Sequence, residues 1–170
     1  MGASAFAFLF TAALALPAAA RGENGGFEAD RYPEFSAAAI VASHPCRPGP
    51  DGYEVKDVPF SLRAEYRPGT RAESKERLEL VKRWSAKLNA AGQADRFTRE
   101  LRMGSGASAP WAAVTQDLID AMRKELKFGE TAWFYMSFIG CVGQEPAFAI
   151  DEFEAADYDD LDDAATSYIT

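Results

Sequence analysis

Histidine and cysteine are scarce in this chain of 170 residues, which contains only His44, Cys46 and Cys141. A triad with an imidazole base would therefore have to use His44. His44 is separated from Cys46 by Pro45, and a disulfide at Cys46 would remove the only nearby thiol nucleophile. Zinc binding by the three residues together is disfavoured, because their spacing matches no zinc motif. We assign no catalytic, cofactor-binding or metal-binding residues and expect no cofactor.

Charged side chains are absent from the first twenty residues, MGASAFAFLFTAALALPAAA. The apolar stretch from Ala5 to Leu16 is shorter than the roughly 20 residues that span a bilayer, and Ala18-Ala19-Ala20 matches the A-x-A cleavage pattern. Residues 1–20 are therefore predicted to be a cleaved signal peptide, with the mature protein periplasmic or secreted. The missing Lys or Arg before the apolar stretch is explained if Met1 lies downstream of the true start. No other long apolar run follows, so we expect no stable membrane insertion after cleavage.

Export determines what the two cysteines should do. Cysteines in an oxidising compartment form disulfides, and two cysteines allow one intramolecular pairing. A bond between Cys46 and Cys141 closes a loop of about 95 residues, which stabilises the fold by roughly 4 to 5 kcal/mol in the chain-entropy treatment. The alternatives are two free thiols or an intermolecular bond.

The net charge of −8 comes from the end of the chain. Residues 151–170 contain eight acids and no base: Asp151, Glu152, Glu154, Asp157, Asp159, Asp160, Asp162 and Asp163. Removing these eight from the 26 acids leaves 18, equal to the 18 Lys and Arg of the rest of the chain. A neutral body disfavours nucleic acids and anionic membranes as partners. Residues 155–170 are predicted to be a flexible acidic tail, without the glycine and glutamate of an EF-hand.

Hydrophobic patterning predicts the elements of one domain, residues 21–154. Alternation from Val58 to Tyr66 is typical of a strand, and Thr70-Arg71-Ala72-Glu73 matches a capping box that starts a helix ending before Gly92. A second helix is predicted from Ser108 and Pro110 to Gly129, because Trp111, Val114, Leu118, Met122 and Leu126 share one face. Residues 37–42 fit either a strand or a helical turn, residues 44–52 are a loop, and residues 96–103 favour a strand.

The end of the domain is predicted to be a hairpin. Residues 131–142 (TAWFYMSFIGCV) are nearly continuously apolar, as in a central strand covered on both sides, and residues 148–153 return as a second strand. We therefore expect an α+β fold, a mainly antiparallel sheet with two amphipathic helices packed on one face. Gly129-Glu130 followed by an aromatic strand that closes on Phe138-Ile139-Gly140 resembles small exported bacterial proteins of unknown function, over about residues 55–154. That resemblance implies no activity.

The glycine-containing segment that begins at residue 104 does not match a nucleotide-binding motif. Gly104-Ser105-Gly106 lacks both the Lys-Ser or Lys-Thr of a phosphate-binding loop and the third glycine of a dinucleotide fingerprint. We interpret it as a turn.

Two functional hypotheses remain. The favoured one is a non-catalytic periplasmic module that binds another periplasmic or envelope protein, because no catalytic constellation is present and aromatic residues are abundant: Trp111, Trp133, Phe134, Tyr135 and Phe138. It requires several of these to be exposed together. The alternative is a small carboxylate-based enzyme or small-ligand carrier with a pocket between sheet and helices. Asp117, Asp120 and Glu125 lie on the second predicted helix, and catalysis would require two convergent carboxylates with raised pKa values.

Overall fold

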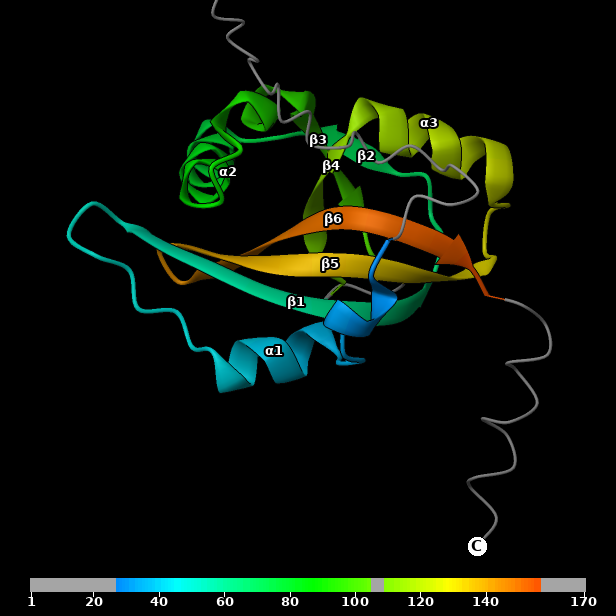
Figure 1. The fold of residues 1–170 in the computed structure, drawn as a ribbon, viewed down its shortest axis with the longest axis horizontal. Coiled ribbons are helices and arrows are strands. Elements are labelled where there is room, and N and C mark those ends of the chain that lie inside the picture. The colour runs from blue at the N-terminus through cyan, green and yellow to red at the C-terminus, as the bar shows by residue number, and fades with distance from the viewer. Residues whose placement is uncertain (1–26, 105–108, 157–170) are drawn as a thin grey trace, which may run out of the picture.

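The computed structural model of the chain describes residues 27–104 and 109–156 (Figure 1). The predicted signal peptide, Ser105 and Gly106 of the glycine-rich turn, and residues 157–170 of the acidic tail lie outside these residues. Of the eight acids in residues 151–170, Asp151, Glu152 and Glu154 belong to β6 (Glu145–Ala155), the last strand along the chain.

A six-stranded sheet forms the centre of the described domain. Its strands are β1 (Tyr53–Glu65), β2 (Thr70–Ala72), β3 (Phe97–Arg102), β4 (Trp111–Thr115), β5 (Thr131–Val142) and β6 (Glu145–Ala155). They lie in the order β1-β5-β6-β4-β3-β2, and every neighbouring pair is antiparallel except β4 and β6, which are parallel. The predicted α+β fold with a mainly antiparallel sheet is therefore confirmed.

The helices differ from the prediction in number. The described residues contain three α-helices, α1 (Ala37–Ser43), α2 (Lys75–Lys87) and α3 (Gln116–Glu125), and two short 3-10 helices, η1 (Ala29–Arg31) and η2 (Ala91–Arg96). The ambiguous run at residues 37–42 is the additional helix, α1. Its first turn is capped by the Ser36 side chain, which accepts a hydrogen bond from the Ala39 amide. The cap satisfies an amide that has no partner within the helix.

The helices also do not share one face of the sheet. Alternate residues of a strand point to opposite faces of the sheet. Alternate residues of β4 therefore belong to two different buried clusters. Ala112 and Val114 pack in one cluster with Ile40 of α1 and with Leu118, Ile119 and Met122 of α3. Ala113 packs in the other with Leu80, Val81 and Trp84 of α2. Figure 1 shows α2 and α3 above β6, with α1 below β1.

The predicted capping box at Thr70 is wrong. Residues Thr70–Ala72 form β2, which pairs with Leu101, Glu100 and Arg99 of β3. The helix begins after Ser74, whose side chain accepts a hydrogen bond from the Arg77 amide at 3.2 Å. Pairing with a distant strand has replaced the local capping pattern, and a serine four residues later caps the helix instead.

The predicted start of the second helix is also wrong. Trp111–Thr115 form β4, and α3 begins at Gln116. The Thr115 side chain accepts a hydrogen bond from the Leu118 amide at 3.4 Å and so caps the helix. Trp111 and Val114 therefore belong to a strand. Leu118 and Met122 lie on the buried face of α3 as predicted, and Leu126 is buried just beyond its end.

Strand β1 begins earlier than predicted, at Tyr53. Phe60 and Tyr66 are buried as its alternation requires, but Ser61, which the pattern places in water, is only 5% exposed. The backbone of Ser61 bonds on the outer edge of β1 to Pro33 and Phe35. The segment around residues 33–35 thus lies beside Ser61, a position that the alternating pattern alone predicts to be exposed.

The β5–β6 hairpin forms as predicted and contains most of the large, fully buried side chains of the sheet. Cys141, which is fully buried in β5, lies with its sulfur 2.03 Å from that of Cys46, so the expected pair is present at bonding distance. Next to it, Gly140 has φ = +129° and lies against the backbone of β1. The register shifts on both sides of this point, between Val55 and Val58 of β1 and between Phe138 and Gly140 of β5.

Candidate functional site

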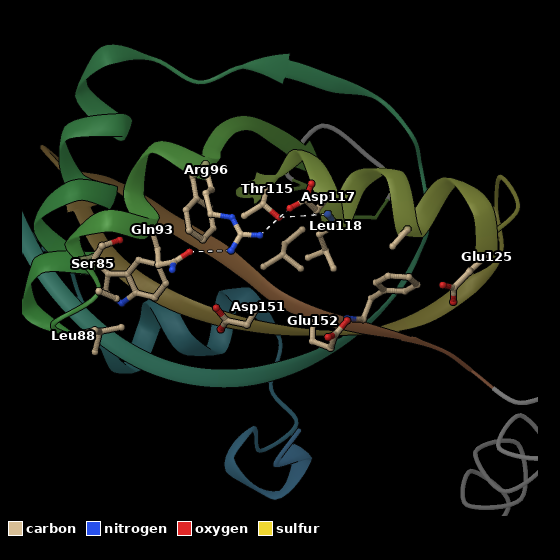
Figure 2. A pocket seen from close by; sticks show the side chains of 16 residues that line it. Ser85, Leu88, Gln93, Arg96, Thr115, Asp117, Leu118, Glu125, Asp151 and Glu152 are labelled. Atoms are coloured by element: carbon tan, nitrogen blue, oxygen red, sulfur yellow. Dashed lines mark hydrogen bonds and ion pairs between the residues drawn. The ribbon is translucent and has the colours of Figure 1, made fainter. Parts of the chain in front are cut away.

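A cleft of about 360 Å³ lies between α2 and α3, over strand β6 (Figure 2). This volume is within the range of small-molecule sites. Its apolar lining comes from α2 and the segment that follows it, from β3, from α3 and from β6: Trp84, Leu88, Ala90, Phe97, Leu118, Ala121, Ile150 and Phe153. Its polar lining is Ser85, Gln93, Arg96, Thr115, Asp117, Glu125, Asp151 and Glu152.

A bulge in β6 brings two carboxylates to the same side of the sheet. Tyr135 of β5 pairs with Glu152, whereas the next residue, Met136, pairs with Ile150, so Asp151 has no opposite residue. A bulge of this kind re-aims side chains next to it. Ile150 and Phe153 belong to the buried core, Asp151 and Glu152 lie between them, and all four residues line the cleft.

Asp151 is held from behind by two hydroxyl groups. Its Oδ2 atom accepts hydrogen bonds from Ser137 Oγ at 2.8 Å and from the Tyr32 hydroxyl at 3.3 Å. Burial raises the pKa of the Asp151 carboxyl to about 7, and the charge of Asp57 acts in the same direction, while the two hydrogen bonds and Arg31 oppose the shift. Burial also raises the pKa of Tyr32, with the Asp151 charge adding to the effect.

The pKa of Asp151 predicts a pH dependence of stability. The folded carboxyl has a pKa of about 7 and the ordinary value is 3.8, so between these values the folded protein keeps a proton that the unfolded chain releases. Asp151 therefore makes the protein less stable as the pH rises from about 4 to 7, by at most about 1.4 kcal/mol per pH unit. Asp151→Asn should remove this contribution, because asparagine does not titrate and its oxygen can still accept the two hydrogen bonds.

Urea unfolding of wild type and Asp151→Asn at pH 4.5 and pH 8 measures this effect. The variant should gain stability relative to the wild type at pH 8. Asp120→Asn, at an exposed position of α3, is the matched control and should not change the trend. Equal pH dependence of wild type and Asp151→Asn would contradict the assignment.

Arg96 of η2 lies at the opposite side of the cleft from Asp151 (Figure 2). Its guanidinium donates to Asp117 Oδ2 at 2.8 Å and to Gln93 Oε1 at 2.9 Å. These contacts join η2 to the first turn of α3, so Arg96 holds the two walls together. They also place a carboxylate against the guanidinium, which neutralises its charge.

The residues singled out in the sequence are distributed over the whole molecule. Asp117 and Glu125 line the cleft, whereas Asp120 does not, and its partners are Gln116 and Arg123 on the same helix. The His44 ring lies near the Ser43 hydroxyl and the Ile40 carbonyl, at 3.0 and 3.2 Å. With Cys46 bonded to Cys141, neither thiol is available to His44 as a nucleophile. Among the described residues, no group of three or more His, Cys, Asp or Glu side chains could hold a metal ion.

The aromatic residues of the hairpin are mostly core. Phe134 and Phe138 are fully buried, and Tyr135 is 8% exposed with its hydroxyl donating to Glu154 at 2.9 Å. Trp111 and Trp133 are half-buried. Each has a guanidinium over its ring, Arg71 at 4.3 Å from the Trp111 centroid and Arg63 at 5.7 Å from that of Trp133.

A second group of buried charges, at the β2–β3 edge, is explained by mutual pairing. Glu100 is 1% exposed and forms ion pairs with Arg71 at 2.6 Å and Arg77 at 3.3 Å. Burial, followed by the charge of Glu100, raises the pKa of nearby Glu73 to about 8. None of these residues lines the cleft between α2 and α3, and their ion pairs join β2, β3 and α2.

The sequence did not single out the most important cleft residue, Asp151, which counted only among the eight acids of residues 151–170. A signal for Asp151 does exist, since this acid directly follows the apolar residues 146–150 of the same strand. Its meaning depends on the bulge, which is a property of the pairing with β5.

Within residues 27–104 and 109–156, no helix is both long and apolar enough to cross a bilayer. Comparison with known proteins finds no matching family model, no matching curated protein and no matching solved structure.

Proposed function

We propose that this is an exported, non-catalytic binding protein that holds a small molecule in the cleft between α2 and α3. The observation that carries the proposal is the cleft itself, a mainly apolar space of about 360 Å³ with a partly buried carboxyl at its floor. Apolar walls with a few convergent polar groups are typical of ligand sites. Export is supported by the predicted signal peptide and by the cysteine pair, since disulfides persist in oxidising compartments.

Binding of a protein partner through an aromatic face has less support. The aromatic side chains that motivated it are largely buried or covered by arginines. The large hydrophobic side chains exposed in the described residues come from three separate segments, with Phe27 and Phe35 before β1, Leu88 after α2 and Phe128 before β5. Of these, Leu88 lines the cleft.

A carboxylate-based enzyme is the second candidate function. It is favoured by the pKa of Asp151, about 7, which lies in the range that suits a general acid at neutral pH. Binding is preferred because the mainly apolar lining of the cleft is sufficient to hold a ligand, whereas Asp117, one of the carboxylates considered for catalysis, is paired with Arg96.

Filling the cleft tests the proposal. Ala121 lies on the α3 wall, and Ala121→Trp should place an indole in the space and weaken binding of the neutral probe 1-naphthylmethanol at least tenfold. Ala86→Trp, the same substitution at an exposed position of α2 outside the cleft, should leave binding unchanged. Binding is followed by amide shifts in two-dimensional NMR, which also show whether each variant is folded. Equal affinities for the two variants, or shifts away from the cleft, would refute the proposal.

A further inference from the structure

The charges that line the cleft are unbalanced along β6. Arg96, the one Lys or Arg side chain among the lining residues, is paired with Asp117 at 2.8 Å. Asp151 and Glu152 of β6 add two neighbouring carboxyl groups to the lining, and Arg96 pairs with neither. A small apolar space with this lining attracts positive charge and repels negative charge.

We propose that the ligand is an organic cation, an apolar body that carries an ammonium group received by Asp151 and Glu152. This inference rests on the proposed function and specifies the class of molecule that the cleft takes. The expected ligand is a small amine and not a neutral or anionic molecule.

The geometry of Asp151 leaves an acceptor for such a group. Both hydrogen bonds from Ser137 and Tyr32 end on Oδ2, and Oδ1 accepts none from the described residues. Since Asp151 lines the cleft, a donor entering it can reach this carboxyl. The two hydroxyl groups fix the orientation of the carboxyl before a ligand arrives, which reduces the entropy lost on binding.

Glu152 supplies a second carboxylate on the same side. The bulge places it beside Asp151 on the cleft wall, and its Oε1 accepts a hydrogen bond from the Phe153 amide at 3.1 Å. An ammonium group has three donors and no acceptor, so two neighbouring carboxylates suit it. A ligand carboxylate would meet only like charge at this end of the cleft.

The rest of the cleft suits an apolar body. Trp84 and Phe97 meet edge to face with their ring centroids 6.0 Å apart, and both line the space. The only polar atom of the Trp84 indole, Nε1, donates a hydrogen bond to Asp57 at 3.0 Å, so the indole offers the ligand an apolar surface. Leu118 and Ile150 complete an apolar wall. A ring system could lie against these side chains while its amine points to Asp151.

Three matched probes test the inference by titration calorimetry at pH 8, where the Asp151 carboxyl is ionised: 1-naphthylmethylamine, 1-naphthylmethanol and 1-naphthoate. The amine should bind at least tenfold more tightly than the alcohol, and the naphthoate most weakly. Asp151→Asn should weaken amine binding at least fivefold and bring the amine and alcohol affinities closer together. Asp120→Asn, an exposed carboxylate outside the cleft, should change neither.

The outcomes separate the two proposals. If the alcohol or the naphthoate binds as tightly as the amine, and Ala121→Trp still blocks it, the cleft is a ligand site but the inference of a cationic ligand is overturned. If none of the three probes binds, the proposed function itself is overturned. The ratio of amine to alcohol affinity in the wild type is informative even if Asp151→Asn does not fold.

Discussion

Replacing Gly140 with alanine should destabilise the protein by at least about 4 kcal/mol, a large fraction of the total stability of a typical single domain. A Cβ atom at this position would overlap the carbonyl oxygen of Glu54 and lie 2.9 Å from its carbonyl carbon and 3.1 Å from the Lys56 amide nitrogen. These are backbone atoms of the neighbouring strand, which cannot rotate away as a side chain can. The φ of +129° is a further cost for any residue with a Cβ.

Gly143→Ala is the matched control. Gly143 lies in the β5–β6 turn with φ = +57°, and a Cβ there meets nothing within 4 Å, so its cost should be limited to about 1 to 2 kcal/mol for the left-handed conformation. Urea unfolding of the purified variants measures both values, and the yield of folded protein gives a second comparison. Equal stability of the two variants would show that β1 and β5 can separate at Gly140 without loss, contrary to our expectation.

Removing the disulfide should have the second large effect, a loss of about 2 to 5 kcal/mol. Cys46 and Cys141 are 95 residues apart in the sequence, so the bond restricts most of the unfolded domain. It also fixes the loop before β1 to a fully buried position in β5. The double variant Cys46→Ala/Cys141→Ala is preferred to serine, because a buried hydroxyl without a partner would add a separate cost.

Urea unfolding with and without reductant isolates the contribution of the bond. Reduced wild type should approach the stability of the double variant, and the double variant should not respond to reductant. A wild type whose unfolding midpoint is unchanged by complete reduction would contradict the prediction. Alkylation followed by mass spectrometry establishes that reduction was complete.

The sequence predicted an element reliably where a strand is buried on both faces. Residues 131–142 are so continuously apolar that only a central strand could bury them, and the glycine-containing turn at Gly143 required the next strand to return beside it. The pairing of two cysteines followed from their number. These features gave the fold class and the hairpin from local information.

The start of α3 shows why helix boundaries failed. Trp111 and Val114 lie three residues apart, which places them on one face of a helix, whereas in β4 they point to opposite faces of the sheet. The strand is selected by pairing of Ala112 and Ala113 with Phe148 and Ala149 of β6, a contact between parallel strands that local periodicity does not encode. Thr70–Ala72 was misassigned for the same reason, since its partner is β3.

The cleft was the least predictable feature. The sequence placed Asp117 and Glu125 on one helix, but the presence of both Asp151 and Glu152 at the same space depends on a register shift between two strands. Such a shift depends on how β5 and β6 pair, and neither strand shows it alone. A pocket between sheet and helices was one of two hypotheses, and its residues required the three-dimensional arrangement.

The neighbours of β1 in the sheet also bear on how fast the chain can fold. β1 meets β5 through residue pairs as distant as Tyr53 with Val142, so its main contacts join the two ends of the domain. Closing such distant contacts costs chain entropy before any pairing energy is recovered, and proteins rich in them fold in milliseconds to seconds. During synthesis, β1 therefore stays without its partner β5 until nearly the whole domain has been made.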